Sequence, residues 1–503
     1  MEKIILATRD DLLRTVSEFG GEIIGDPPPP SGYGYHPRAM AETAANRLRL
    51  RELSKQARSG LLINGEVIHI SPELYERLYI GKRVPLTMYH DERHPAVTLL
   101  PAWKQENIVD HFSDPIGFER MRLWFGSFDF FIQEDSWLEQ VLCTPPFWRM
   151  GSIVQLGNLV APLPIGLRSD QEIVFLGEPF RHTRWIHSRL AAAMAEVLLA
   201  RLGFSSVERA SIVLAIAYHD IAIPAGGDAI KRIDPWFLNE ERNFAWVLQQ
   251  YGLDKKWERQ YGFDLQQAAA WVRNEGMPGF LLDFLDKLSY VTLDCHALGL
   301  QRDGQTRRFC LEHQLFADVW LDLQCSEDRH RLAFTDPRRL CNFLMARAHA
   351  SSELYYNPFA RTYDYLLTEV VGELYKHGLV TWQNLVTWSQ DELLRVIEKK
   401  SRLFHSLRKL LDTIPNILEP QQLDFRWFPT EEERDAFAAT LGDRLHHRDK
   451  TKPFTTCLDW PVFTDPDKRL TTAPLHSFLS DQQIFELEWL ARSRAGYYVY
   501  YRK

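Results

Sequence analysis

The sequence feature that most constrains the fold is a helix that carries two polar side chains into the protein interior. The run from Ala210 to Tyr218 is apolar almost throughout and ends directly in His219-Asp220. Ser205 and Glu208 precede it at the spacing of a capping box, which predicts where the helix begins. A helix that is apolar nearly all round is buried, so His219 and Asp220 need polar partners inside the protein. We therefore expect a mainly α-helical core built around a polar site.

A His-Asp dipeptide alone carries little information. With 17 histidines in the chain, composition predicts about one such pair by chance, and the sequence contains two. His90-Asp91 stands in the polar stretch 89–95, which ends in Pro95 and shows no helical pattern, so we interpret it as a solvated loop. Only His219-Asp220 is positioned by a helix.

A second helix is predicted to open at Arg184. Its apolar residues recur at the spacing of a core-facing stripe: Ile186, Leu190, Ala193, Met194, Val197 and Leu198. His187 lies beside this stripe. One interpretation is a core histidine that is satisfied by a single hydrogen bond. The other is a ligand that faces His219-Asp220.

A third helix is predicted over residues 280–294, and it is strongly apolar. Asp286, Lys287, Tyr290 and Asp294 nevertheless fall within a sector of about 100° at 3.6 residues per turn. A solvent-facing stripe is the simple alternative. If the helix lies in the core, this polar stripe needs a polar partner.

Two imidazoles and two carboxylates that converge on one point would form a site for one divalent cation. The candidates are His187, His219, Asp220 and Asp286. An ion held in this way activates water against a phosphate ester. This donor set suits Fe, Mn, Zn, Ni or Mg and does not decide among them.

From about residue 114 to residue 397, the sequence resembles the HD-domain deoxynucleoside triphosphate triphosphohydrolases, which include the dGTPases and the sterile-alpha-motif HD-domain enzyme. Residues 114–117 are similar to the family's D-P-I/V-H-G motif, and residues 142–157 to its T-P-x-F-Q-R-L-x-x-I-x-Q-L-G segment. Residues 184–188 fall on R-F-E-H-S, and residues 286–296 on D-K-x-D-Y-x-x-R-D-C-H. The order of these pieces carries the resemblance.

The resemblance implies a role for each matching residue. His187, His219, Asp220 and Asp286 would ligate the metal ion. Arg184 and Lys287 would hold triphosphate oxygens by charge-assisted hydrogen bonds.

The resemblance also implies contacts with the sugar. Gln155 and Leu156 would close over the ribose and disfavour a ribonucleotide, while Tyr290 and Asp294 would meet the sugar. Arg347 and Tyr355 match an R-x7-Y pair that reaches phosphate and the base or sugar. For this last pair the alternative is two ordinary residues on a helix surface.

The sequence departs from the family pattern where acid catalysis would occur. Ile223 and Asp228 stand at the positions of two family histidines, and Asn239-Glu240 stands where the family has a His-Glu pair. General acid catalysis contributes about two to four orders of magnitude in rate. Asp228 would replace a histidine only if burial beside phosphate raised its pKa. We therefore name Asp228 and Arg184 as the candidate catalytic residues.

Composition agrees with a globular cytoplasmic enzyme. The 503 residues are 45% hydrophobic and 25% charged. A net charge of -8 and a pI near 6.1 argue against a protein built mainly to coat nucleic acid. The six cysteines show no CxxC spacing, and neither a secretory leader nor a membrane span is visible, so we expect reduced thiols.

We expect three regions: an N-terminal appendage of unknown role at 1–111, an HD phosphohydrolase core at 112–400 and a C-terminal α+β region at 401–503. In the appendage, the proline-rich run 26–35 is interpreted as a linker and Asn64-Gly65 as a hairpin turn. Capping boxes that begin at Ser389, Thr430 and Ser480 predict further helices.

The last residues, 496–503, have the aromatic and β-branched character of a strand. We expect an ordinary intramolecular strand. The alternatives are weak binding of single-stranded nucleic acid by base stacking, or pairing with the sheet edge of a neighbouring subunit. The family resemblance itself implies a homo-oligomer.

The function expected from these observations is metal-dependent cleavage of deoxynucleoside triphosphates to deoxynucleoside and tripolyphosphate. Two alternatives stay open. One is an HD nucleotidase or phosphodiesterase that acts on another nucleotide, such as a monophosphate, a cyclic nucleotide or an alarmone. The other is a protein that binds nucleotide or single-stranded nucleic acid without turnover.

Overall fold

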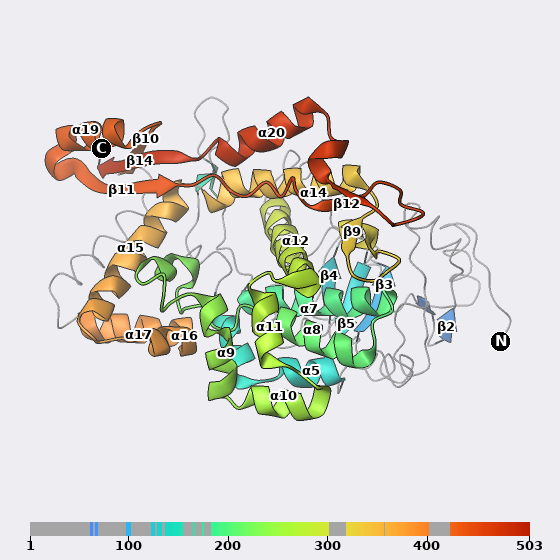
Figure 1. Cartoon of the computed structure of the whole chain (residues 1–503). Coiled ribbons are helices and arrows are strands. Elements are labelled where there is room, and N and C mark those ends of the chain that lie inside the picture. Colours follow the sequence, from blue (N-terminus) through green and yellow to red (C-terminus); the bar gives the residue numbers. More distant parts are fainter. Residues whose placement is uncertain are drawn as a thin grey trace.

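The fold is mainly α-helical with small β-sheets (Figure 1). It comes from a computed structural model that describes residues 136–153, 183–300, 318–356, 358–401 and 423–502, together with short strands at 61–63, 66–68, 97–101, 122–125, 128–132, 164–165 and 174–175. The proline-rich run, His90-Asp91, the 114–117 motif, Gln155 and Leu156 lie outside these residues.

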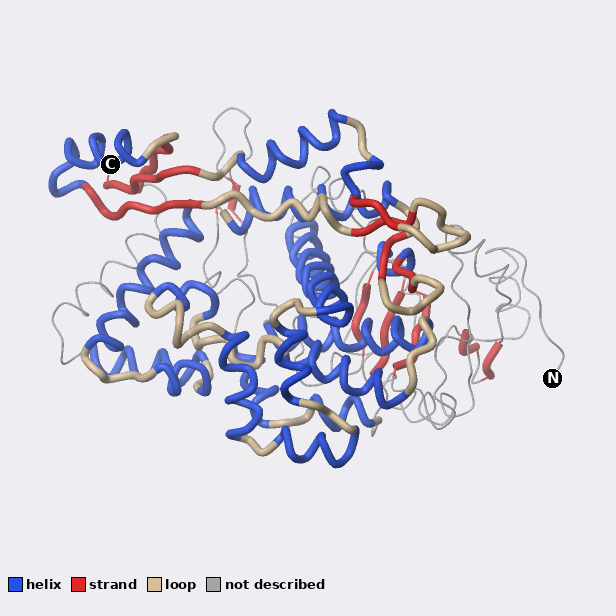
Figure 2. Tube along the Cα trace, viewed as in Figure 1, coloured by secondary structure: helices blue, strands red, loops and turns tan. Residues whose placement is uncertain are grey.

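Helices make up most of the described chain (Figure 2). The long helix at the centre of this view is α12. The bounds of the helices are α5 Trp137–Leu142, α6 Pro145–Arg149, α7 Arg184–Arg201, α8 Ser206–Tyr218, α9 Glu240–Gln250, α10 Leu253–Tyr261, α11 Leu265–Val272, α12 Gly276–Leu300, α14 Pro337–Ala350, α15 Pro358–Lys376, α16 Trp382–Thr387, α17 Gln390–Ser401, α19 Glu431–Leu441 and α20 Asp481–Arg492. A 3₁₀ helix, η4, spans Gly227–Arg232.

The three helices predicted to carry the polar site form the centre of the core. α8 begins with the expected capping box, in which the Ser205 hydroxyl accepts from the backbone N–H of Glu208 and the Glu208 carboxylate accepts from that of Ser205. α7 packs along α8, and α12 packs against both. Their apolar side chains belong to one large buried cluster that includes Leu190, Leu214 and Leu285. The polar residues of the site are therefore enclosed by hydrophobic packing.

Two of the remaining capping boxes are confirmed: at the starts of α17 and α20, the hydroxyls of Ser389 and Ser480 accept from backbone N–H groups three residues further on, and the side chains of Glu392 and Gln483 accept in return. At the start of α19, the structure shows the first of these two bonds, in which the Thr430 hydroxyl accepts from the Glu433 N–H. In the first hundred residues, β1 (Leu61–Ile63) pairs antiparallel with β2 (Glu66–Ile68), and Ile63 faces Glu66. This register confirms the antiparallel pairing of the two predicted strands; Asn64-Gly65 lies outside the described residues.

One sheet joins the predicted core to the predicted C-terminal region. The strands β8 (Leu323–Cys325) and β9 (Leu332–Phe334) are antiparallel, and β12 (Pro461–Phe463) adds to β9 in parallel. β13 (Thr472–Pro474) completes the sheet on the other side of β12. The expected boundary at residue 400 stays a prediction, and the two regions share this sheet.

The C-terminal strand is intramolecular, as predicted. β14 (Gly496–Arg502) is the central strand between β10 (Leu423–Phe428) and β11 (Leu445–Thr451). α19 covers one face of this sheet, and Arg361 of α15 donates two 2.8 Å hydrogen bonds to Asp449 of β11. Tyr498 and Tyr500 are each 3% exposed, which leaves them no free ring face for base stacking.

Two smaller strand groups lie among the described N-terminal residues. β5 (Phe128–Ile132) stands between β3 (Val97–Pro101) and β4 (Arg122–Phe125), and β6 (Pro164–Ile165) pairs with β7 (Val174–Phe175).

Among the described residues, the free thiols are those of Cys143, Cys325, Cys341 and Cys457. Across the described residues, every helix is too short or too polar to cross a lipid bilayer.

The burial of α8 is testable by two substitutions in the same helix. Leu214→Ala removes a side chain that is 0% exposed, so we expect the free energy of unfolding to fall by about 2–5 kcal/mol. Val207→Ala truncates a side chain that is 58% exposed, and should change it by less than about 0.5 kcal/mol. Denaturant titration followed by circular dichroism measures both. Equal losses would contradict the buried position of α8.

Candidate metal centre

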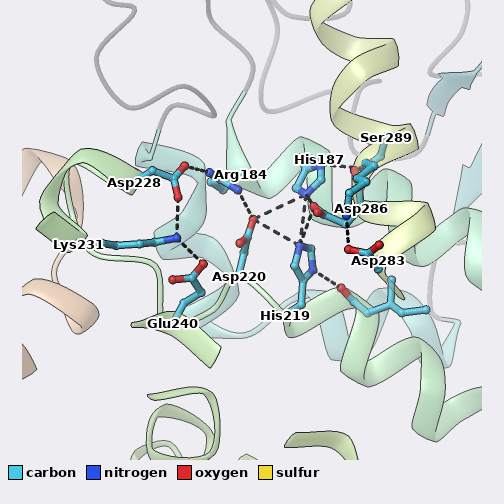
Figure 3. A network of polar contacts seen from close by, with 12 residues as sticks. Arg184, His187, His219, Asp220, Asp228, Lys231, Glu240, Asp283, Asp286 and Ser289 are labelled. Atoms are coloured by element: carbon cyan, nitrogen blue, oxygen red, sulfur yellow. Dashed lines mark hydrogen bonds and ion pairs between the residues drawn. The ribbon is translucent and has the colours of Figure 1, made fainter. Parts of the chain in front are cut away.

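Three helices bring the predicted polar residues together (Figure 3). Arg184 and His187 lie in the first turn of α7, His219 caps the end of α8, and Asp286 lies in the middle of α12. The chain turns sharply after α8, where the Ile221 N–H donates to Tyr218 O and the Ile223 N–H to Asp220 O, both at 2.9 Å. This turn holds Asp220 beside the end of the helix that carries His219.

The side-chain atoms that would hold a metal ion converge on one point. The two Nε2 atoms of His187 and His219 are 3.4 Å apart, and Asp286 Oδ1 lies 3.0 Å and 3.2 Å from them, respectively. Asp220 Oδ2 lies 3.7 Å from His187 Nε2 and 3.5 Å from His219 Nε2. The ligand atoms of His187, His219 and Asp286 all lie within 4.8 Å of one another.

These separations fit a single small cation. Donors at about 2.0–2.2 Å from a tetrahedral ion lie about 3.3–3.6 Å from one another, close to the 3.0–3.4 Å between the ligand atoms of His187, His219 and Asp286. Asp220 Oδ2 lies slightly further from the two imidazoles and also accepts from Arg184 at 2.7 Å. His187 is 0% exposed and Asp220 is 4% exposed. Buried donors at this spacing, with two imidazoles and carboxylate oxygens, can bind a first-row divalent metal.

Both imidazoles are oriented with Nε2 toward the centre. Ser289 donates its hydroxyl proton to Asp286 O at 2.9 Å, and its oxygen lies 2.8 Å from His187 Nδ1. Because a hydroxyl has one proton, this oxygen accepts from His187 Nδ1–H, which leaves Nε2 with a free lone pair. His219 Nδ1 likewise donates to Ile216 O at 2.7 Å. Such outer partners are typical of metal-binding histidines.

The centre attracts positive charge. Burial lowers the pKa of His219, but the carboxylates of Asp220 and Asp286 outweigh burial and raise this pKa to about 9. Burial lowers the pKa of His187. A divalent cation would displace the proton of His219, since metal binding requires neutral imidazole. The residues present therefore fit a bound metal ion.

A row of ion pairs leads away from the centre (Figure 3). Arg184 donates from Nη1 to Asp220 Oδ2 at 2.7 Å and from Nη2 to Asp228 Oδ2. Lys231 donates to the other oxygen of Asp228 at 2.6 Å, and also to Glu240. The row thus alternates acidic and basic side chains from Asp220 to Glu240.

The environment of Asp228 is opposite to the one that acid catalysis requires. Partial desolvation raises the pKa of Asp228, whose side chain is 56% exposed, but Lys231 and Arg184 outweigh this effect and lower the pKa to about 2. The carboxylate is therefore ionised at neutral pH and has no proton to give. Asp228 would need a raised pKa to replace a family histidine as an acid. While it is paired with Lys231 and Arg184, its pKa is lowered instead.

The other described site residues lie on α12, on α14 and on the π-helix Ser351–Tyr355 that follows α14. Lys287 pairs with Asp283, and Arg347 donates from Nε to the Tyr290 hydroxyl at 3.1 Å. Tyr355 donates to Asp294, and the rings of His187 and Tyr290 are 6.2 Å apart. Arg347 is 8% exposed, so the alternative of an ordinary helix-surface residue is wrong for it.

The sequence did not point to Arg149, which shapes the site from outside the metal centre. Arg149 donates from Nε to Trp388 O at 2.9 Å, from Nη1 to Ile221 O at 3.3 Å, and from Nη2 to Ile223 O. It therefore fixes the turn that carries Asp220. Burial lowers the pKa of Arg149 to about 10. Arg149 stands in the segment 142–157, but only the folded turn reveals its partners.

The chain matches no protein-family profile and no curated protein. Its fold is similar to those of solved structures at low sequence identity. One is a phosphohydrolase from Bacteroides thetaiotaomicron, with a TM-score of 0.52 and 14% identity over 74% of this chain and 96% of that one. Another is a hypothetical protein from Aquifex aeolicus, with a TM-score of 0.54 and 15% identity over 76% of this chain and 96% of that one. These similarities establish a shared fold.

The metal centre is testable by metal content and affinity. We expect one equivalent of divalent metal in the reconstituted protein, lost in His219→Ala because an Nε2 donor disappears. Ser289→Ala should weaken affinity by about 10–100-fold, since it removes the partner that orients His187. Elemental analysis and competition with a chelator measure these effects.

The matched control is His377→Ala. This imidazole is 49% exposed and pairs with Glu373 on the surface of α15, so its loss should leave metal content unchanged. Full wild-type affinity in His219→Ala would show that the metal binds elsewhere.

Proposed function

We propose that this protein is a metal-dependent phosphohydrolase that cleaves deoxynucleoside triphosphates to deoxynucleoside and tripolyphosphate. The observation that carries the hydrolase proposal is the convergence of His187, His219 and Asp286 on one point, with Arg184 linked to it through Asp220. The fold shared with a structure described as a phosphohydrolase supports the same reaction class.

When bound, a divalent cation supplies Lewis-acid polarisation and lowers the pKa of water. The protein supplies the remaining parts. His187, His219, Asp220 and Asp286 would hold the ion, and their buried packing excludes bulk solvent from its inner side. Arg184 would neutralise charge at the transferred phosphoryl group, because a preorganised guanidinium stabilises developing negative charge without reorganising.

The nucleotide part of the proposal rests on the residues that match the family motifs. Tyr290, Arg347, Tyr355 and Asp294 form one connected polar group beside His187. The guanidinium of Arg347 would contact phosphate, and Tyr290 and Asp294 would contact the sugar. Lys287 and Arg347 would assist Arg184 with the triphosphate charge.

The proposal is tested by identifying products. The purified protein, loaded with Mn²⁺ or Mg²⁺, is incubated with each deoxynucleoside triphosphate, and products are separated by ion chromatography. We expect deoxynucleoside and tripolyphosphate, with at least a hundredfold lower rate for Asp286→Ala, which removes a metal donor, and an unchanged rate for His377→Ala.

Other outcomes have defined meanings. Orthophosphate with a nucleoside diphosphate would overturn the assignment of the bond. Turnover restricted to a monophosphate, a cyclic nucleotide or an alarmone would establish the alternative nucleotidase or phosphodiesterase, which the missing family histidines keep open. Tight nucleotide binding with no product in any of these reactions would contradict an enzyme.

A further inference from the structure

We propose that Arg184 and Lys231 form a clamp for one phosphoryl group, and that the Asp228 carboxylate occupies this clamp in the free protein. The inference rests on the proposed function, since the group it would receive belongs to a phosphate ester or polyphosphate. It assigns Lys231, which the motif comparison leaves without a role, to substrate binding.

The two oxygens of Asp228 are each taken by a different cation. Oδ2 accepts from Arg184 Nη2, and Oδ1 accepts from Lys231 Nζ at 2.6 Å. Two oxygens of a phosphoryl group bind cationic donors in the same bridging manner, through short charge-assisted hydrogen bonds. The Asp228 carboxylate therefore makes the contacts that a phosphate would make at this position.

Each cation is held in place by a second, less exposed carboxylate. Arg184 also binds Asp220, whose side chain is 5% exposed, and Lys231 also binds Glu240, whose side chain is 19% exposed. The Asp228 side chain is 56% exposed, far more than either cation. Asp228 can thus leave while Asp220 and Glu240 keep both cations oriented.

The clamp adjoins the metal centre. Arg184 Nη1 contacts the same Asp220 oxygen that lies 3.5 Å from His219 Nε2 and 3.7 Å from His187 Nε2. The Asp286 side chain is 26% exposed, so the centre is accessible to a ligand. A phosphoryl group held by Arg184 would be separated from the centre by the single carboxylate of Asp220.

The local backbone places Asp228 at this position. Gly226 and Gly227 precede it with φ of 91° and 75°, a conformation that favours glycine, and they start the 3₁₀ helix that carries both Asp228 and Lys231. The three-residue spacing then puts the carboxylate and the ammonium side by side. An incoming phosphate adds negative charge next to Asp228, so the two anions compete for the same cations.

The test measures binding of inorganic phosphate to the metal-loaded full-length protein by calorimetry. Asp228→Asn removes the competing charge with little change of shape, and we expect the Kd for phosphate to fall about tenfold. Lys231→Met should raise the Kd for phosphate about tenfold. In the double variant, Lys231→Met should abolish the tighter binding that Asp228→Asn alone produces. Lys255→Met is the matched control, because Lys255 forms an exposed pair with Glu258 at the same spacing, and its Kd should not change.

An unchanged or higher Kd in Asp228→Asn would overturn the clamp, as would phosphate binding that is insensitive to Lys231→Met. Thermal unfolding of each variant checks that the fold is retained. Phosphate binding is measured without turnover, so this test is separate from the test of the proposed function. An inactive protein can still confirm the clamp, and an active protein can still contradict it. With an active protein, the clamp predicts a lower KM in Asp228→Asn, whereas an acid role predicts a lower kcat.

Discussion

The whole arrangement depends on Asp286 of α12 meeting two imidazoles at the ends of α7 and α8. Its Oδ1 lies 3.0 Å from His187 Nε2 and 3.2 Å from His219 Nε2, next to the large apolar cluster formed by the three helices. Buried polar groups are costly when unpaired, so these side chains require one another or a cation between them. This requirement fixes where three separate helices meet.

Much of the fold was predictable because its signals are local. The capping box at Ser205, the apolar run that follows it and the hairpin between β1 and β2 depend on neighbours in sequence. The parallel pairing of β9 with β12 was not predictable, because it joins Phe334 to Val462 across a long stretch of chain. Such pairings depend on tertiary packing, which composition and periodicity do not specify.

The candidate metal ligands at the centre of the site were predictable from the sequence. The residues that orient these ligands were less predictable. The positions of His187, His219, Asp220 and Asp286 follow from helix periodicity and the motif resemblance, and the structure brings them together. The contacts of Arg149 with backbone carbonyls, and of Ser289 with His187, depend on the path of a turn and on the register between helices. The ionised state of Asp228 follows from Lys231 and Arg184, whose convergence appears only after folding.

The most direct test of the metal centre is anomalous diffraction from a crystal of the protein loaded with Mn²⁺ or Zn²⁺. Our account predicts one strong anomalous peak among His187, His219, Asp220 and Asp286, with imidazole nitrogens about 2.0–2.2 Å from the ion. A peak coordinated by other residues, or no peak between these side chains in fully loaded protein, would contradict it.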